Sequence, residues 1–174
     1  MSIAIRPLVP DDAPQYTALR IEMLKESPTS FGASLDTDVA STVEGARGRL
    51  SSPLPSRMWG AFEEGSGALV GVVGGGKQGA HHKRAHVYAV WGMYVQPKFR
   101  GVGISKALMG ELLAFARGLD GVISVYLSVS ETAAAAQALY ASLGFQVWGC
   151  EPRSLQYEGE YFDEIYMLMD LRTA

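Results

Sequence analysis

The stretch HVYAVWGMYVQPKFRGVGISKALMGELLAFARGL, residues 86–119, constrains the fold most strongly. Its first part is rich in β-branched and aromatic residues, which is typical of a strand, and its last part has the apolar spacing of a helix. Between them, Gly101 and Gly103 allow a tight turn. A glycine turn that leads from a strand into a helix exposes unpaired backbone N–H groups, so this stretch predicts an anion-binding site.

The rest of the chain continues this mixture of strands and helices. The turn EGSG between two apolar runs predicts a hairpin. Strands are expected at 3–8, 57–64, 68–75, 86–95, 122–129, 145–149 and 164–171, and helices at 12–26, 37–50, 101–118 and 132–143. This pattern predicts an α/β (α+β) fold with a mixed central sheet of about six to seven strands flanked by helices, in a single domain over residues 1–174.

Composition excludes several classes of protein. Apolar residues make up 48% of the chain and charged residues 19%, which is typical of a globular domain. A net charge of −3 argues against a broad nucleic-acid interface. No apolar run is long enough to cross a membrane, and the N-terminus reaches charge and proline too early for a signal peptide. The single cysteine, Cys150, favours a reducing compartment, so we expect a cytoplasmic protein.

The glycine turn does not match two common phosphate loops. A dinucleotide fingerprint needs a third glycine where this chain has Lys106, and a lysine there would block close packing of helix on strand. A Walker loop needs a glycine followed by Lys-Ser or Lys-Thr, and the chain has no such run. Binding of ATP or NAD is therefore the weaker alternative.

The pattern that remains is R-x-x-G-x-S at 100–105, between a strand and a helix. It resembles the acetyl-CoA loop of the GCN5-related N-acetyltransferase (GNAT) family. The surrounding GMYVQPKFRGVGISKAL and the later LYASLGF, at 139–145, are similar to segments that occur in this order in the family. The resemblance implies an acyl-CoA N-acyltransferase fold, with acetyl-CoA as the acetyl donor and no metal.

The resemblance also assigns residues to the cofactor. The turn would hold the pyrophosphate through backbone N–H groups, and Ser105 replaces the usual glycine or alanine. The backbone of the central strand would hold the pantetheine arm and polarise the thioester. Strict alternation would place Tyr94 on the same face as Val90. The expected cofactor-binding residues are Met93, Tyr94, Val95, Arg100, Gly101, Val102, Gly103, Ile104, Ser105 and Lys106.

The catalytic residues are less well marked. In the family a tyrosine at the place of Tyr140 often protonates the departing thiolate, which is acid catalysis by a positioned hydroxyl. Many members carry an asparagine seven residues earlier, where this chain has Ala133. They also often carry a glutamate on the central strand, which is absent here. Glu22 on the first helix is then a candidate base, with Tyr94 or a chain of ordered waters as the other options.

The expected reaction is transfer of an acetyl group from acetyl-CoA to a primary amine, by direct attack in a ternary complex. The acceptor, a small molecule or a peptide, is not revealed by the loops 26–36, 74–85 and 151–162. The acidic residues of 151–170 form either a solvated face or a region that attracts an acceptor with extra positive charge. Members of the family are often dimers, and no feature of the sequence decides whether this protein forms a homodimer.

Two other functions are compatible with parts of the sequence, namely binding of acyl-CoA without catalysis and binding of a metal. A non-catalytic acyl-CoA-binding sensor or interaction module would explain the missing strand glutamate and Ala133. The pair His81 and His82 could suggest a metal site, but no further Cys or His supports it, so a solvated loop is expected.

Overall fold

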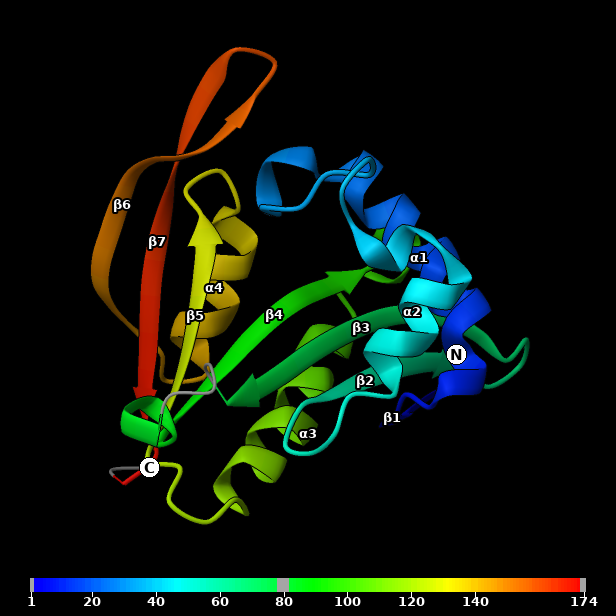
Figure 1. The fold of residues 1–174 in the computed structure, drawn as a ribbon, viewed down its shortest axis with the longest axis horizontal. Helices are drawn as coiled ribbons and strands as arrows, with labels where there is room; N and C mark the ends of the chain where they lie inside the picture. The colour runs from blue at the N-terminus through cyan, green and yellow to red at the C-terminus, as the bar shows by residue number, and fades with distance from the viewer. Residues whose placement is uncertain (1, 78–81, 173–174) are drawn as a thin grey trace.

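A computed structural model of the chain describes residues 2–77 and 82–172 (Figure 1). It contains a seven-stranded mixed sheet in the order β1-β2-β3-β4-β5-β7-β6, which confirms the expected fold class. His81 and the side chain of His82 lie outside the described residues. The strands are β1 (Ile3–Pro7), β2 (Arg57–Glu63), β3 (Ala68–Lys77), β4 (Val87–Val95), β5 (Ser124–Ser130), β6 (Gln146–Tyr157) and β7 (Glu160–Asp170).

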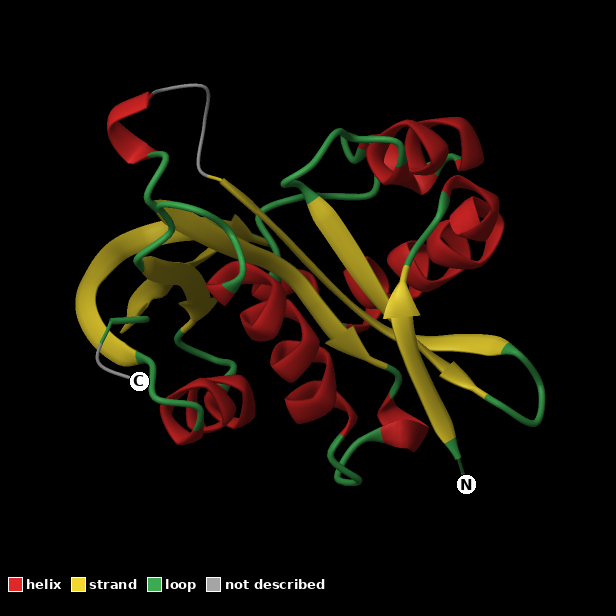
Figure 2. Ribbon diagram, turned by 90° about the horizontal axis from the view of Figure 1, so that it is seen from below, coloured by secondary structure: helices red, strands yellow, loops and turns green. Residues whose placement is uncertain are grey.

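Helices cover the sheet unequally on its two faces. Figures 1 and 2 show α3 and α4 on one face, and α1 and α2 on the other face over β2 to β4 alone. None of the described helices is long and apolar enough to cross a membrane. The α-helices are α1 (Ala13–Glu26), α2 (Val43–Leu50), α3 (Ile104–Arg117) and α4 (Ala134–Ser142), and the 3-10 helices are η1 (Pro10–Asp12), η2 (Pro28–Ser30), η3 (Val39–Ser41), η4 (His82–Arg84) and η5 (Pro97–Phe99).

Two apolar cores follow from this arrangement. Helix α3 buries Leu108, Met109 and Leu112 against the sheet, at the three-to-four-residue spacing of one helix face. Helices α1 and α2 pack into a second core with Val72 and Tyr94 on the opposite face. Among the described residues, no member of β5, β6 or β7 belongs to this second core, so that half of the sheet is covered by helices on one face only.

Strands β4 and β5 form the parallel pair at the centre of the sheet, and they separate early. Their register joins Val87 to Ser124, Tyr88 to Val125 and Ala89 to Tyr126, after which no further pairs are made between them in the described chain. Beyond this point β4 stays paired with β3, and β5 stays paired with β7. The two strands therefore open like a V toward their carboxyl ends.

A bulge at Gly92 changes the side-chain pattern of β4. The register with β3 shifts between Val72 and Gly74, and Gly92 has a φ of +62°. Tyr94 consequently packs into the core beneath α1, whereas Val90 belongs to the core beneath α3. The alternation expected from the sequence was wrong here, because one extra residue in a strand reverses the faces of all that follow.

The carboxyl-terminal strands also differ from expectation. The range 151–162 was predicted as a loop, but it continues β6 and begins β7 in a long hairpin whose turn contains Glu158 and Gly159. Irregular pairing between Glu151 and Leu155 breaks the strand period in the sequence. The helix expected at 37–50 is shorter, because the Thr42 hydroxyl accepts a bond from the Gly45 N–H and begins α2 at Val43.

The bulge gives a direct test of the fold. An alanine Cβ at Gly92 would meet no neighbour within 4 Å, so Gly92→Ala should cost only the strain of a positive φ, about 1–2 kcal/mol of unfolding free energy. Gly48 on α2 is equally uncrowded but has no positive φ, so Gly48→Ala should stabilise by about 0.5–1 kcal/mol. Denaturant unfolding of both variants checks this pair, and equal effects would contradict the bulge.

Candidate active site

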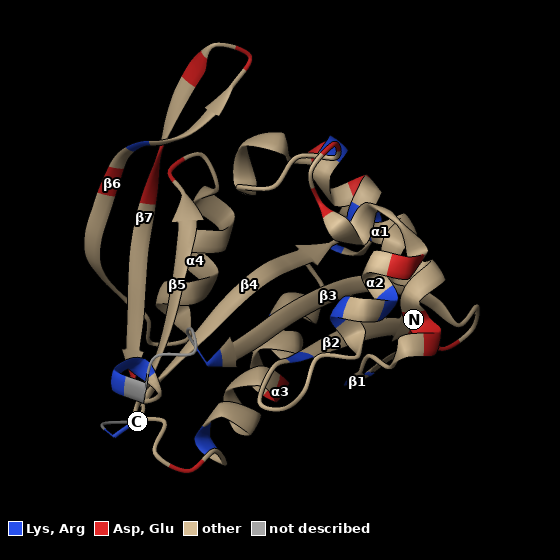
Figure 3. Ribbon diagram, viewed as in Figure 1, with Lys and Arg blue, Asp and Glu red and all other residues tan. Residues whose placement is uncertain are grey.

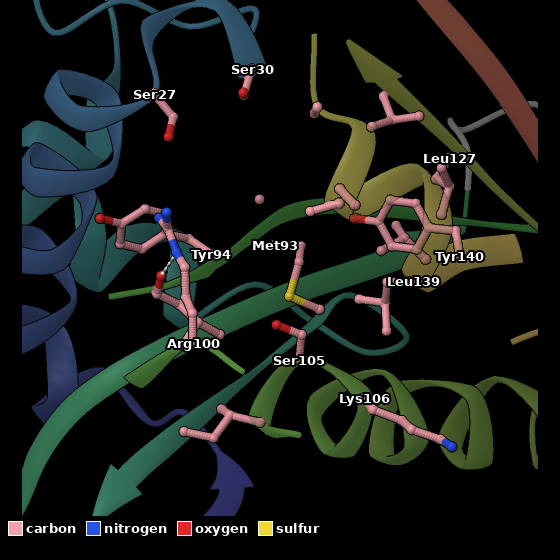
Figure 4. Close-up of a pocket in the computed structure, with 18 of the residues that line it drawn as sticks. Ser27, Ser30, Met93, Tyr94, Arg100, Ser105, Lys106, Leu127, Leu139 and Tyr140 are labelled. Atoms are coloured by element: carbon pink, nitrogen blue, oxygen red, sulfur yellow. Dashed lines mark hydrogen bonds between the residues drawn. The ribbon is translucent and has the colours of Figure 1, made fainter. Parts of the chain in front are cut away.

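A cavity of about 720 Å³ fills the opening between β4 and β5 (Figure 4). Its walls come from the carboxyl half of β4, the N-terminal turn of α3, the middle of β5, the start of α4 and the segment around η2. It therefore lies where the two parallel strands no longer satisfy each other's backbone groups. Such an opening at the carboxyl ends of strands is a common place for a ligand.

The turn before α3 supplies the polar end of this cavity. Gly101 and Gly103 have φ values of +80° and +88°, a region that favours glycine. Gly103 precedes the helix and carries no side chain that could cap it, so the first N–H groups of α3 are available to a ligand. Helix α3 also directs the positive end of its dipole to this point, which favours an anion.

Arg100 lies beside this turn, but its guanidinium is already engaged. Its two terminal nitrogens donate to the Glu26 carboxylate at 3.1 and 2.9 Å, and its Nε donates to the Val95 carbonyl at 2.8 Å. The hydrogen bonds between the two side chains raise the pKa of Arg100 and lower that of Glu26. The side chain thus ties the turn to the end of α1. Lys106 also lines the cavity.

The backbone of β4 forms one wall. Met93, Tyr94 and Val95 all line the cavity, and β4 uses its other edge to pair with β3. The edge that faces β5 is left unpaired over these residues in the described chain. Unpaired backbone groups in a half-enclosed site are available to bind an extended ligand.

Tyr140 comes from α4 and reaches the cavity from the opposite wall. Its ring packs edge-on against Phe145 with 5.9 Å between centroids, and Figure 4 shows its hydroxyl directed toward the cavity. Burial raises its pKa to about 12. At neutral pH the hydroxyl therefore keeps its proton, as an acid catalyst requires.

Two of the predicted residues lie apart from the cavity lining. The Glu22 carboxylate accepts from the Tyr94 hydroxyl at 3.2 Å and from Gln96 Nε2 at 2.6 Å, so both of its oxygens have partners inside the protein. Val102 is exposed at the tip of the turn. All the other predicted cofactor-binding residues and Tyr140 line the cavity together, while the role of Glu22 as a base stays a prediction.

The sequence reading missed a second group of lining residues. Ser27, Ser30 and Phe31 approach from η2 and its flanks, Trp91 from β4, and Ser128 from β5. The first three lie in a segment that carries no motif. Ser128 lies in an alternating strand, whose pattern could have marked it as exposed on the face opposite Leu127.

The chain is similar to known acetyltransferases. A model of the acetyltransferase (GNAT) family matches residues 12–145. N-alpha-acetyltransferase RimI of Mycobacterium tuberculosis is 42% identical over 93 residues, which are 53% of this chain and 55% of that protein. An uncharacterised protein of Mycobacterium leprae is 40% identical over 85 residues, which are 49% of this chain and 22% of that protein. The matches therefore span about half of the first relative and less of the second.

Solved structures share the fold over nearly the whole chain. Ribosomal-protein-alanine N-acetyltransferase from Brucella melitensis has a TM-score of 0.83 at 24% identity, covering 97% of this chain and 99% of that one. The structure of yncA from Salmonella typhimurium, solved with its cofactor acetyl-CoA, has a TM-score of 0.82 at 20% identity, covering 98% and 95%.

A charge change at the start of α3 tests the anion site. Ser105→Asp places a carboxylate at the helix N-terminus, where it should stabilise the helix by about 0.3–1 kcal/mol but repel a bound pyrophosphate. We expect at least about tenfold weaker binding of acetyl-CoA in calorimetric titration, with no loss of thermal stability. The control Ser105→Ala should bind within about threefold of the parent chain. Equal binding by the aspartate variant would exclude this helix end as the site.

Proposed function

Because the chain belongs to the acetyltransferase (GNAT) family, we propose that it transfers an acetyl group from acetyl-CoA to a primary amine. One observation carries this proposal. A single cavity connects the uncapped N-terminus of α3, the unpaired edge of β4 and the hydroxyl of Tyr140. An anion-binding end, a strip of free backbone groups and an acid, in that arrangement, suit a phosphate-bearing thioester with an extended arm.

In this proposal each part of the cavity has one task. The N–H groups from Arg100 to Lys106 bind the pyrophosphate, and the side chain of Arg100 holds this turn against α1. The backbone of Met93 to Val95 binds the pantetheine arm and donates to the thioester carbonyl, which stabilises the developing oxyanion. Tyr140 donates its proton to the departing thiolate. The amine attacks directly, so no covalent acyl-enzyme is formed.

The names of the relatives support an amine as the acceptor. RimI is described as an N-alpha-acetyltransferase, and the Brucella protein as a ribosomal-protein-alanine N-acetyltransferase. We extend to this chain the common feature, a primary amine of a peptide or small molecule. The single free cysteine, Cys150, supports a location in the reducing cytoplasm.

A second candidate is a sensor that binds acyl-CoA without catalysis. Ala133 favours it, because it lines the cavity at the position where many family members present an asparagine. This protein would bind acetyl-CoA but would release no thiol with any amine.

Tyr140→Phe distinguishes an enzyme from a sensor. The parent chain should bind acetyl-CoA saturably in calorimetry, with ATP and NAD as controls, and should release thiol when an amine is present. The variant loses the acid but keeps the ring packing, so kcat should fall about 100-fold while the Kd for acetyl-CoA changes less than about threefold. A folded parent chain that binds no acetyl-CoA would overturn the proposed function.

The pH profile provides an independent test of Tyr140. A free alkyl amine is about one part in a thousand neutral at pH 7, so kcat/KM should rise about tenfold per pH unit above neutrality. The pKa of Tyr140 is raised to about 12, so the acid stays protonated and no descending limb should begin below about pH 10. A descending limb below that pH that vanishes in Tyr140→Phe would contradict the raised pKa, and a Tyr140→Phe variant with the parent rate at every pH would contradict the acid role.

A further inference from the structure

The open face of β5, β7 and β6 lies on the other side of the sheet from α3 and α4. Val125, Leu127 and Val129 point into the core beneath those helices, so Tyr126 and Ser128 point the opposite way. In Figures 1 and 2 no α-helix covers this half of the sheet on that side, and the short helices η2 and η4 lie near its two ends. The acceptor of the proposed reaction has to reach the thioester from a side that the cofactor does not fill.

One carboxylate on this open face is held next to the cavity. The Ser128 hydroxyl donates to Glu164 Oε1 at 3.0 Å, and the Ser154 hydroxyl donates to Oε2 at 2.8 Å. Ser128 itself lines the cavity. Glu164 is half-buried and forms no ion pair with the described residues, in contrast to the Glu26 carboxylate, which pairs with Arg100. Two hydroxyl donors orient a carboxylate without neutralising its charge.

Three aromatic rings form a continuous surface beside this carboxylate. Tyr166 stacks on Trp148 with 5.4 Å between centroids and on Tyr126 with 5.9 Å. Trp148 is 61% exposed, so the rings are accessible from solvent. The Tyr166 hydroxyl donates to Glu151, which places a second carboxylate at the edge of the ring surface. Ring faces and carboxylates both attract organic cations.

The hairpin end of this face is strongly negative, whereas the cation Arg84 of η4 lies near Tyr126 toward the other end. The β6–β7 hairpin carries Glu151, Glu158, Glu160, Asp163, Glu164 and Asp170 against Arg153 alone. Figure 3 shows this acidic end of the sheet, and the loop after β5 adds one further acidic residue, Glu131. A field of one sign near a cleft concentrates ligands of the opposite charge.

We infer that this open face binds the acceptor, that Glu164 receives its reacting ammonium group, and that the acceptor is a primary amine with a second positive charge. The second charge lies over the Tyr166 and Trp148 rings, near Glu151. This inference rests on the proposed acetyl transfer. It assigns to Glu164 the role of general base, for which the central strand has no glutamate.

The proton balance is complete with the groups present. Glu164 takes one proton from the ammonium and returns it to solvent, and the neutral nitrogen attacks the thioester carbon. The C–N bond forms and the C–S bond breaks, and Tyr140 gives its proton to the thiolate. The second proton leaves the nitrogen as the amide forms and restores the hydroxyl of Tyr140. The products are the amide and the free thiol.

Binding is tested with three probes of one chain length: α,ω-diaminopentane, its amino-alcohol analogue and aminopentane. The NMR signal of the Trp148 indole N–H should shift saturably with the diamine, which should bind about tenfold tighter than the other two. The buried Trp59 serves as the internal control. An unshifted Trp148 signal, or equal affinity for the three probes, would overturn the inference.

Glu164→Gln removes the charge and keeps the shape. We expect diamine affinity and the kcat/KM for acetylation of the diamine each to fall at least tenfold, while the Kd for acetyl-CoA and the thermal stability stay unchanged. Glu160→Gln, at the exposed end of the hairpin, should change none of these. A Glu164 variant with parent kinetics, or a Glu22→Gln variant that alone loses turnover, would also overturn it. Failure of the parent chain to bind acetyl-CoA would instead reject the proposed function. The two outcomes are distinguishable, because the Trp148 signal measures binding of the amine and calorimetry measures binding of acetyl-CoA.

Discussion

The early separation of β4 and β5 is the constraint on which the rest of the structure depends. After three paired residues the strands leave each other, although each keeps its outer neighbour. Backbone groups inside a folded domain need hydrogen-bond partners, so an opened sheet is costly unless water or a ligand fills the gap. The bulge at Gly92 makes the opening local, because β4 bends there and resumes its pairing with β3. The backbone groups that are left unpaired at the centre of the sheet are therefore available to bind a ligand.

Helix α3 joins this opening to the core. Its apolar face, with Leu108, Met109 and Leu112 fully buried, fixes the helix axis against the sheet. The N-terminus is then held at the mouth of the V, and the pair of Arg100 with Glu26 fastens the preceding turn to α1. A surface ion pair contributes little to stability by itself. Its value here is positional, because it fixes the turn from which the helix N–H groups point into the cavity.

The sequence predicts the local parts of this site and misses the long-range parts. The turn at Gly101 and Gly103, the helix that follows and Tyr140 were placed correctly, because each depends on residues close together in the chain. The faces of β4 were misassigned, since a single bulged residue at Gly92 leaves no periodic signal. The β6–β7 hairpin was partly read as a loop, because its irregular pairing breaks the period of two. The contact of Ser128 with Glu164 joins residues 36 positions apart, and only the register of β5 with β7 brings them together.

In the proposed reaction, the two faces of the opened sheet supply groups with opposite roles in proton transfer. Tyr140 lies among apolar side chains of the α4 side, where desolvation disfavours the phenolate and raises its pKa. Glu164 lies on the uncovered face, where the hydroxyls of Ser128 and Ser154 donate to its two oxygens and fix their orientation. The proposed acetyl transfer uses Tyr140 as the acid for the departing thiolate and Glu164 as the base for the amine, which meet between β4 and β5. In that proposal, the unequal helix cover of the sheet, set by which strands have two apolar faces, determines the sides from which acceptor and donor approach each other.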